Sequence, residues 1–382
     1  MNVAHVITRM IVGGAQENTL DSVRGLQALG NYQVSLFSGP ELGPEGDLLG
    51  VSGGRAPSLR TVRWLRRAIS PLCDALAFLE LVRIFSREKF DVVHTHSSKA
   101  GILGRLAARW TGVPLIVHTV HGFAIGPYHH PLRNFLYRAL ERFAARRTDV
   151  MIYVTGALMA EAGRLGLRPR QSCIVPSGFD WEMFAGARQR REEIRRRLGI
   201  AEREVVIAKV ARFFPLKGHE QLFRALGPLL EKYAHLKFLL VGDGILKSHF
   251  QEIVKTAGWS DRVLFTGLIP SPAVADHLAA SDILAHTSLR EGLARAIPQA
   301  FACRLPVVCY DIDGVADLVA DGESGFLVKA FDAGGLERSL ATLVEDADLR
   351  RRMGEKGSAL AKEKYALGSM VRALDAIYRG IP

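Results

Sequence analysis

The sequence predicts an α/β protein with two doubly wound, Rossmann-like domains that follow each other along the chain. Short apolar runs rich in β-branched residues alternate with longer stretches of helical periodicity, which is typical of βαβ units with parallel sheets. The 382 residues exceed the size at which one hydrophobic core keeps growing. Glycine, histidine and arginine residues follow the predicted strands, at the sheet edge where open α/β folds bind ligands.

Ten apolar runs are predicted to form strands. They are residues 2–8, 32–38, 90–96, 114–120, 149–155, 204–211, 236–242, 262–267, 282–287 and 305–310. A Pro-Ser-Gly turn at 176–178 leads into one charged helical stretch before the second set of strands, and therefore indicates the domain break. We assign a front domain to residues 1–183, a rear domain to 184–364 and a closing helical segment to 365–382, and expect the two sheets to face each other across a cleft.

Composition indicates an ordinary globular protein, with 48% hydrophobic and 23% charged residues. The four cysteines are scattered, without a C-x2-C pair, as expected in a reducing compartment. The first residues lack a basic segment followed by a long apolar run, and no stretch reaches about 18 uninterrupted apolar residues. We therefore expect a cytoplasmic location.

The net charge of +11 calls for an anionic partner or a solvated basic surface. Arginines interleave with apolar residues in the stretch 55–83, a pattern that suits an anionic membrane surface or a solvated loop and helix equally well. The residues concerned are Arg55, Arg60, Arg63, Arg66 and Arg67, with Leu59, Val62, Trp64, Leu65 and Ile69. Nucleic-acid binding fits less well, because no helix-turn-helix, RRM or zinc-finger pattern accompanies the charge.

Three strand-end segments are candidates for chemistry. Gly13 and Gly14 follow the first strand, where they either let backbone N–H groups approach an anion or simply form a tight turn. Arg212 and Lys217 follow the first strand of the rear half, five residues apart. Two fixed cations there suit a diphosphate, although surface charges flanking a loop are an equally ordinary explanation.

The third segment, "SLREGLARAIPQAFA", places Glu291 before an apolar helical pattern. We expect the helix to begin around Gly292 and Leu293, whose N–H groups are then among the unpaired donors of its first turn. Gln299 lies about two turns further on, and Pro298 requires a bent or broken helix. Glu291 is either a favourable charge at the helix start or a ligand-binding carboxylate.

Taken together, the motifs "GGAQ", "DVVHTHSSKAGILGRLAAR", "HTVHGF", "VPSGFD", "VARFFPLKGHE", "VGDG", "FTG" and "SLREGLARAIPQAFACRLPVV" occur in order over nearly the whole chain. This set resembles the retaining nucleotide-sugar glycosyltransferases of the GT-B fold that carry an E-x7-E motif. The resemblance implies a front domain that binds the acceptor, a rear domain that binds the nucleotide-sugar, and a closing helix that crosses back to the front domain.

The resemblance also implies roles for single residues. Arg212 and Lys217 match the pair that holds the donor diphosphate, with the Gly14 turn near the same phosphates. Glu291 matches the first glutamate of the motif, which contacts the donor sugar, and Gly292 and Leu293 match the backbone amides around it. His121 matches a histidine near the transferred sugar and the acceptor, whereas His94, His96 and His118 are equally well explained as packed strand-end residues.

Two positions depart from the family pattern. Gln299 stands in place of the second glutamate, which typically binds the ribose hydroxyls, and Ala211 replaces the glycine that usually precedes the arginine. Glutamine still donates and accepts hydrogen bonds to a diol without the carboxylate's charge. These changes leave donor affinity and base preference open.

The resemblance thus implies a hexosyltransferase whose partners are a nucleotide diphosphate-sugar and a glycan or polyprenyl-diphosphate-linked acceptor. We expect no metal and no cofactor, because the two cations can stabilise the leaving diphosphate. The favoured setting is bacterial surface polysaccharide synthesis at the inner face of the membrane. A nucleotide-sugar 2-epimerase of the same fold and a non-catalytic nucleotide-sugar-binding subunit are the alternatives.

Overall fold

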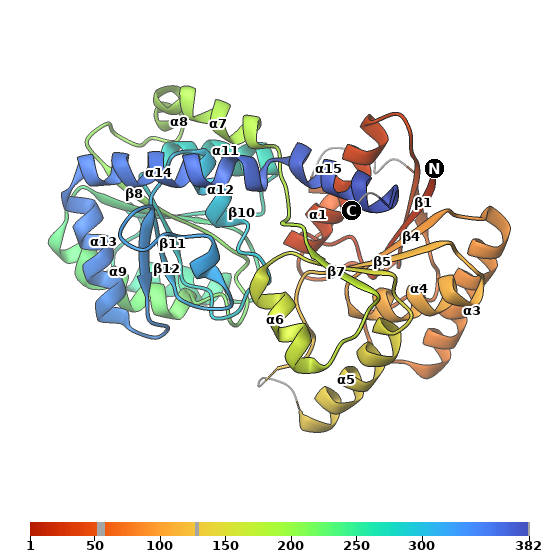
Figure 1. The fold of residues 1–382 in the computed structure, drawn as a ribbon. Coiled ribbons are helices and arrows are strands. Elements are labelled where there is room, and N and C mark those ends of the chain that lie inside the picture. The colour runs from red at the N-terminus through yellow and green to blue at the C-terminus, as the bar shows by residue number, and fades with distance from the viewer. Residues whose placement is uncertain (52–57, 127–129, 381–382) are drawn as a thin grey trace. The chain divides into compact units, whose positions relative to one another are not determined.

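The computed structural model describes residues 1–51, 58–126 and 130–380, so Arg55 lies outside the described residues. The chain forms two compact units, Met1–Gly178 with Leu367–Pro382, and Phe179–Ala366. Each contains one parallel sheet with helices on both faces (Figure 1). Both units are therefore Rossmann-like, as the alternating runs predict.

Unit 1 holds a seven-stranded sheet in the order β3-β2-β1-β4-β5-β6-β7. Its strands are β1 (Asn2–Ile7), β2 (Gln33–Ser38), β3 (Leu59–Thr61), β4 (Val92–His96), β5 (Leu115–Val120), β6 (Val150–Tyr153) and β7 (Gln171–Ile174). Its helices are α1 (Gly14–Ala28), α2 (Leu48–Val51), α3 (Pro71–Glu88), α4 (Ser98–Trp110), α5 (Pro131–Ala145), α6 (Gly156–Leu165) and α15 (Leu367–Tyr378).

Unit 2 holds a six-stranded sheet in the order β10-β9-β8-β11-β12-β13. Its strands are β8 (Val205–Val210), β9 (Leu236–Val241), β10 (Val263–Gly267), β11 (Ile283–His286), β12 (Val307–Tyr310) and β13 (Gly325–Val328). Its helices are α7 (Trp181–Gln189), α8 (Arg191–Arg197), α9 (His219–Lys232), α10 (Lys247–Thr256), α11 (Ser271–Ala280), α12 (Ala296–Ala302), α13 (Ala333–Glu345) and α14 (Ala347–Tyr365), with a short 3-10 helix at Val315–Asp317.

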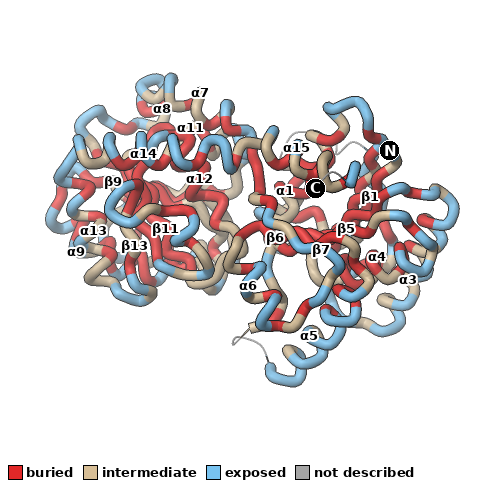
Figure 2. The backbone as a smooth tube through the Cα atoms, viewed as in Figure 1, coloured by how far each residue is buried: buried red, intermediate tan, exposed pale blue. Residues whose placement is uncertain are grey.

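Both sheets are buried on their two faces, which Figure 2 shows as red strands under partly exposed helices. In β1, Val3 and Ile7 join the core beneath α1 and α15, while Ala4 and Val6 join the core beneath α3 and α4. Since successive side chains alternate between faces, His5 lies on the α1 and α15 face. This placement matters for the histidines described below.

The ten predicted strands are all present, but three short strands were not predicted. β3, β7 and β13 are edge strands of three or four residues, and β3 is exposed throughout. An edge strand that buries little apolar surface leaves no continuous apolar run in the sequence. The single charged helix predicted after residue 178 is also wrong, because it is divided at Arg190 into α7 and α8.

The basic stretch that follows residue 55 is less exposed than its composition suggests. Val62 and Leu65 are fully buried and pack into the core with α3 and α4. Leu59 and Ile69 remain exposed. The apolar residues of this stretch thus divide between the core and the surface, and do not form one continuous outward face.

Helix α15 belongs to unit 1 although unit 2 precedes it in the chain. Its Met370, Leu374 and Tyr378 are buried in the same core as Leu20 and Val23 of α1. The Tyr32 hydroxyl donates a hydrogen bond to Asp375 Oδ1 at 2.5 Å. The packing of α15 against α1 therefore closes one face of the first sheet (Figure 1).

Candidate active site

Two loops at the carboxyl ends of β8 and β11 are held together by backbone contacts. Gly218 has φ +66°, and a Cβ atom there would lie 1.6 Å from the carbonyl oxygen of Thr287. The Thr287 hydroxyl donates a hydrogen bond to the Gly218 carbonyl at 2.6 Å, and the Leu289 N–H donates to the Leu216 carbonyl at 2.8 Å. Only glycine fits this close approach, which fixes Lys217 beside the segment that carries Glu291.

Lys217 and Glu291 form an ion pair, with 2.7 Å between Nζ and Oε1. Their side chains are only 20% and 14% exposed. Burial would raise the pKa of Glu291, but the Lys217 ammonium and the neighbouring His286 lower it well below its ordinary value. The carboxylate is therefore ionised at neutral pH. The Glu291 N–H also donates to Asp313 Oδ2 at 2.9 Å, which orients its backbone.

A buried lysine lies close to this ion pair, and it was not predicted from the sequence. Lys209 of β8 is 1% exposed, and its Nζ donates to the Thr287 hydroxyl at 2.8 Å. Burial, together with the charge of Lys217, lowers the pKa of Lys209 to about 7 despite the opposing effect of Glu291. The signal in the sequence was one lysine within the apolar run 204–211.

His286 completes the charged cluster at the end of β11. Its Nε2 lies 3.6 Å from Glu291 Oε1. Burial lowers the pKa of His286, with Lys209 and Lys217 acting in the same direction and Glu291 opposing them. Two lysines and one histidine thus surround one carboxylate. Because Glu291 is paired with Lys217 and burial lowers the pKa values of His286 and Lys209, the cluster carries little net positive charge at neutral pH.

Arg212 follows β8 on a segment held by a glycine loop. A Cβ atom on Gly242 would lie 2.2 Å from the Ala211 carbonyl oxygen, and one on Gly244 would lie 2.6 Å from that of Phe213. Both glycines have positive φ, so larger residues are disfavoured there. The guanidinium lies 5.2 Å from the centre of the Phe214 ring. Arg212 and Lys217 thus lie in the same loop, between β8 and α9.

The helix expected at Gly292 and Leu293 begins later, so that prediction is wrong. The first residue of α12 is Ala296, and the segment before it is irregular. This start places Pro298 in the first turn, where proline is tolerated because its missing N–H needs no partner. Gly292 and Leu293 are half-buried in the preceding loop, and Gln299 lies buried within α12.

The remaining predicted residues lie in unit 1. Gly14 is the exposed first residue of α1, and Glu17 lies in the first turn of that helix. His121 directly follows β5, and its Nε2 lies 3.1 Å from Nδ1 of His96. Unit 2 therefore brings Lys217, Glu291 and their neighbours together, while Gly14 and His121 belong to the other unit.

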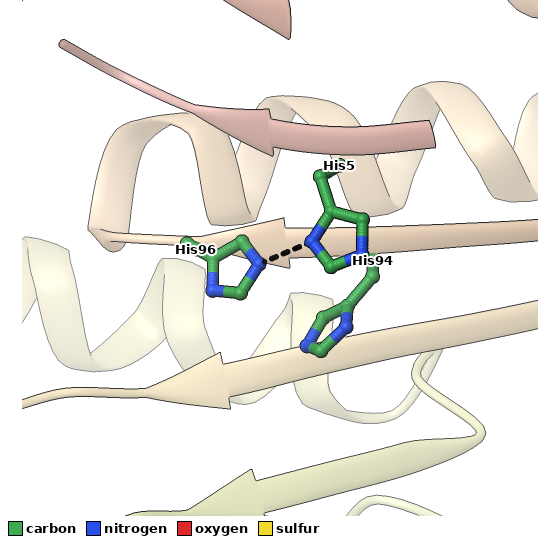
Figure 3. A group of neighbouring side chains, drawn as sticks. All are labelled: His5, His94 and His96. Carbon is green, nitrogen blue, oxygen red and sulfur yellow. Dashed lines mark hydrogen bonds between the residues drawn. The ribbon is translucent and has the colours of Figure 1, made fainter. Parts of the chain in front are cut away.

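His121 adjoins a group of buried histidines. Within the described residues, His5, His94 and His96 offer ring nitrogens that lie within 4.8 Å of one another, a spacing that a metal ion could use (Figure 3). These nitrogens already have hydrogen-bond partners: His5 Nδ1 and His96 Nε2 lie 3.0 Å apart, and His94 bonds to Tyr378 and Thr119. A metal would have to displace those bonds.

Unit 1 also contains a cationic pocket of about 770 Å³ that the sequence did not reveal. Thr8 and Ser97, which line it, follow β1 and β4. Its charged lining residues are Arg9, Glu41, Arg67, Lys99 and Arg133. Only Arg67 was singled out from the sequence, because the others are far apart along the chain.

Comparison with known proteins identifies the family. The model for the glycosyl transferase 4-like domain matches residues 13–178, and the model for glycosyl transferases group 1 matches residues 190–359. The chain is 32% identical to the Escherichia coli UDP-Gal:alpha-D-GlcNAc-diphosphoundecaprenol alpha-1,3-galactosyltransferase, over 91% of this chain and 88% of that protein. The chain belongs to the group 1 glycosyltransferases.

Solved structures show the same fold for this glycosyltransferase. HepE from Anabaena, in complex with UDP-glucose, superimposes with a TM-score of 0.82 at 21% identity and covers 100% of both chains. WaaG, a glycosyltransferase involved in lipopolysaccharide biosynthesis, superimposes with a TM-score of 0.76 at 19% identity, over 99% of this chain and 100% of WaaG. The fold is GT-B and the enzyme is a hexosyltransferase, as the sequence predicts.

Among the described residues of this glycosyltransferase, no helix is both long enough and apolar enough to cross a bilayer.

Proposed function

We propose that the enzyme transfers a hexose, with retention and without a metal, from a nucleoside diphosphate-sugar to a sugar carried on polyprenyl diphosphate. The observation that carries the proposal is the buried pair of Lys217 and Glu291, flanked by Lys209 and following Arg212 in the chain. A relative whose name includes UDP-Gal and diphosphoundecaprenol, and a structural neighbour that binds UDP-glucose, support UDP as the nucleotide and a lipid-linked acceptor.

The cations of unit 2 suit the leaving group of this reaction. Breaking the bond between the anomeric carbon and the diphosphate sends the electron pair to the phosphate oxygen, while positive charge develops on the sugar. Arg212 and Lys217 would bind the diphosphate, and the fixed charges stabilise it as it leaves without reorganisation. A metal ion would serve the same purpose, so these side chains make one unnecessary.

Glu291 is suited to the sugar rather than to the phosphates. Its carboxylate stays ionised beside Lys217, so it accepts hydrogen bonds from sugar hydroxyls and opposes the positive charge that develops on the ring. The amides of Gly292 and Leu293 lie in the adjoining loop and would donate to the donor, with Gln299 at the ribose. His121 would contact the transferred sugar or the acceptor, and the Gly14 turn would lie near the phosphates.

The pocket in unit 1 is suited to the acceptor. Arg9, Arg67, Lys99 and Arg133 provide the positive charge that a diphosphate-linked glycan requires, and Tyr137 adds an aromatic surface for a sugar. Two of these cations already have carboxylate partners: Arg9 lies 3.5 Å from Glu45, and Lys99 lies 2.6 Å from Asp74. The partners limit the net charge, as expected for a ligand that must be released.

Helix α5 is suited to an anionic membrane, such as the cytoplasmic leaflet. Five large apolar side chains on it are exposed, namely Leu132, Phe135, Leu136, Leu140 and Phe143, and α5 is largely pale blue in Figure 2. Arg133 and Arg138 lie among them in the sequence, and Arg133 also lines the acceptor pocket. An amphipathic helix with arginines binds the lipid interface without crossing it.

The direct test combines purified enzyme, UDP-sugars and GlcNAc-diphosphoryl lipid, with EDTA present. Formation of an α-linked disaccharide, shown by the anomeric proton coupling, would support transfer with retention. A β-linked product, or a strict requirement for added Mg²⁺ or Mn²⁺, would contradict the corresponding part of the proposal. Release of an epimerised sugar without transfer would favour the 2-epimerase alternative.

A further inference from the structure

Six polar side chains in unit 1 form one unbranched series of hydrogen-bonding contacts, here named the histidine chain. In order, it consists of Thr119, His94, Tyr378, His5, His96 and His121. The contacts are Thr119 Oγ1 to His94 Nε2 at 2.7 Å, His94 Nδ1 to Tyr378 Oη at 2.5 Å, Tyr378 Oη to His5 Nε2 at 3.2 Å, His5 Nδ1 to His96 Nε2 at 3.0 Å, and His96 Nδ1 to His121 Nε2 at 3.1 Å.

The interior residues of the histidine chain are neutral at physiological pH. His5, His94 and His96 are at most 1% exposed, and Tyr378 is 3% exposed. Burial lowers the pKa of His5 to about 3 and lowers the pKa values of His94 and His96 well below their ordinary range. Burial also raises the pKa of the Tyr378 hydroxyl. Each imidazole therefore has one donor nitrogen and one acceptor nitrogen.

Because each imidazole has one donor and one acceptor nitrogen, the tautomer of one histidine determines the tautomer of the next. If His94 carries its proton on Nδ1, it donates to Tyr378, whose hydroxyl then donates to His5 Nε2. His5 must in turn donate from Nδ1 to His96, and His96 from Nδ1 to His121. When all the hydrogen bonds are donated in the opposite direction, from His121 toward Thr119, every histidine carries its proton on Nε2. Any mixture places two donors or two acceptors against each other, or leaves the buried Tyr378 proton without a partner, which costs free energy.

We propose that the histidine chain gives His94, His5, His96 and His121 one shared tautomer, and that Tyr378 of α15 is the positioning residue that transmits it between His94 and His5. Figure 3 shows three of these rings, with His5 and His96 joined by their hydrogen bond. The inference rests on the proposed function only where it concerns catalysis, because the tautomer of His121 would decide which ring nitrogen can accept a hydrogen bond from the sugar or the acceptor.

A metal site at His5, His94 and His96 is the competing interpretation of the same cluster. Both ring nitrogens of each of these histidines already bond within the histidine chain, so a bound ion would break at least two of the contacts given above. Within the histidine chain, all six ring nitrogens of these three histidines have a hydrogen-bonding partner without an ion.

The test is a two-bond ¹H–¹⁵N correlation spectrum of the full-length protein labelled with ¹⁵N-histidine, which distinguishes the two neutral tautomers. Resonances are assigned with single His→Asn variants. We expect His94, His5, His96 and His121 to show the same tautomer. Different tautomers among these four, or stoichiometric zinc that resists chelation and shifts the His5 and His96 nitrogens, would overturn the proposal.

Tyr378→Phe provides the sharper comparison, because it removes one hydroxyl and keeps the ring. Without the hydroxyl, the two parts of the histidine chain on either side of Tyr378 no longer share a direction of hydrogen-bond donation. A buried N–H without a partner is less tolerable than an unpaired acceptor, so His94 should protonate Nε2 toward Thr119 and His5 should protonate Nδ1 toward His96. We expect mixed tautomers in this variant, and a shared tautomer that survives the substitution would contradict the coupling.

Tyr32→Phe is the matched control, because it removes a hydroxyl that bonds to Asp375 of the same helix and leaves the histidine chain intact. It should keep the shared tautomer. If the wild-type tautomer is Nε2–H, Tyr378→Phe switches His121 and should lower kcat by about tenfold or more at an unchanged donor KM. A switched His121 with unchanged kcat would reject its catalytic role and leave the coupling itself supported.

Discussion

Nζ of Lys217 lies 2.7 Å from Oε1 of Glu291, although the two residues are 74 positions apart in the chain. The pair joins the cation proposed for the leaving diphosphate to the carboxylate proposed for the sugar. Its two members should therefore fail in different ways when they are replaced.

Lys217→Ala should weaken UDP binding by about 10- to 100-fold, because it removes a charge-assisted contact to phosphate. Glu291→Gln should keep UDP binding within about threefold and lower kcat by about 10²-fold or more, because its carboxylate acts on the sugar. Calorimetry with UDP and steady-state kinetics separate the two effects. Lys232→Ala, which breaks an exposed pair with Glu345, is the control and should change neither. Equal loss of UDP affinity in both site variants would contradict the division of roles.

Gly218→Ala should destabilise unit 2 by about 3 kcal/mol or more. The new methyl group would lie 1.6 Å from the Thr287 carbonyl oxygen at a residue with φ +66°, so steric overlap adds to the backbone strain. Gly258→Ala is the matched control: its φ is +71° with nothing within 4 Å of the added Cβ, and it should cost about 1 kcal/mol. Urea unfolding measures the free energy of unfolding of both variants. Similar decreases would show that the loop at Gly218 relaxes to accommodate the methyl group, which would contradict the prediction.

Lys209 should make stability depend on pH in a defined window. Its pKa is about 7 in the folded protein against an ordinary value of 10.5, so between these values the unfolded chain binds more protons. The free energy of unfolding of the wild type, relative to Lys209→Met, should therefore rise as the pH increases from about 7 to 10.5. Chemical denaturation across this range provides the measurement, and parallel curves for the two proteins would contradict the low pKa.

The double variant Leu132→Ser, Phe135→Ser should lower binding to vesicles that contain anionic lipid by about 10-fold or more, since it removes two side chains that are 70% and 72% exposed. Because both side chains are largely exposed, the substitutions should not affect folding. Ile245→Ser, at an exposed apolar residue of unit 2, is the control and should bind normally. Flotation assays compare the three proteins, and full binding by the double variant would exclude α5 as the contact.

The sequence predicted the buried strands because each must be apolar on both faces, and that requirement leaves a continuous run in the chain. It did not predict β3, whose exposed side chains carry no such pattern. Lys209 and the pairing of Lys217 with Glu291 depend on how separate strands align, and spacing within one segment does not determine this. The start of α12 was misplaced because the apolar pattern begins at Leu293, before the helix does. Pro298 fits the first turn of a helix that starts at Ala296 and does not require a bend.

The packing of α15 has a consequence for the order of folding during synthesis. Met370, Leu374 and Tyr378 fill a core whose other members lie within the first 175 residues. On the ribosome, the first unit must therefore wait with that core open while all of unit 2 is translated and emerges. A nascent chain stalled before residue 367 would expose this apolar surface and would be a natural substrate for chaperones.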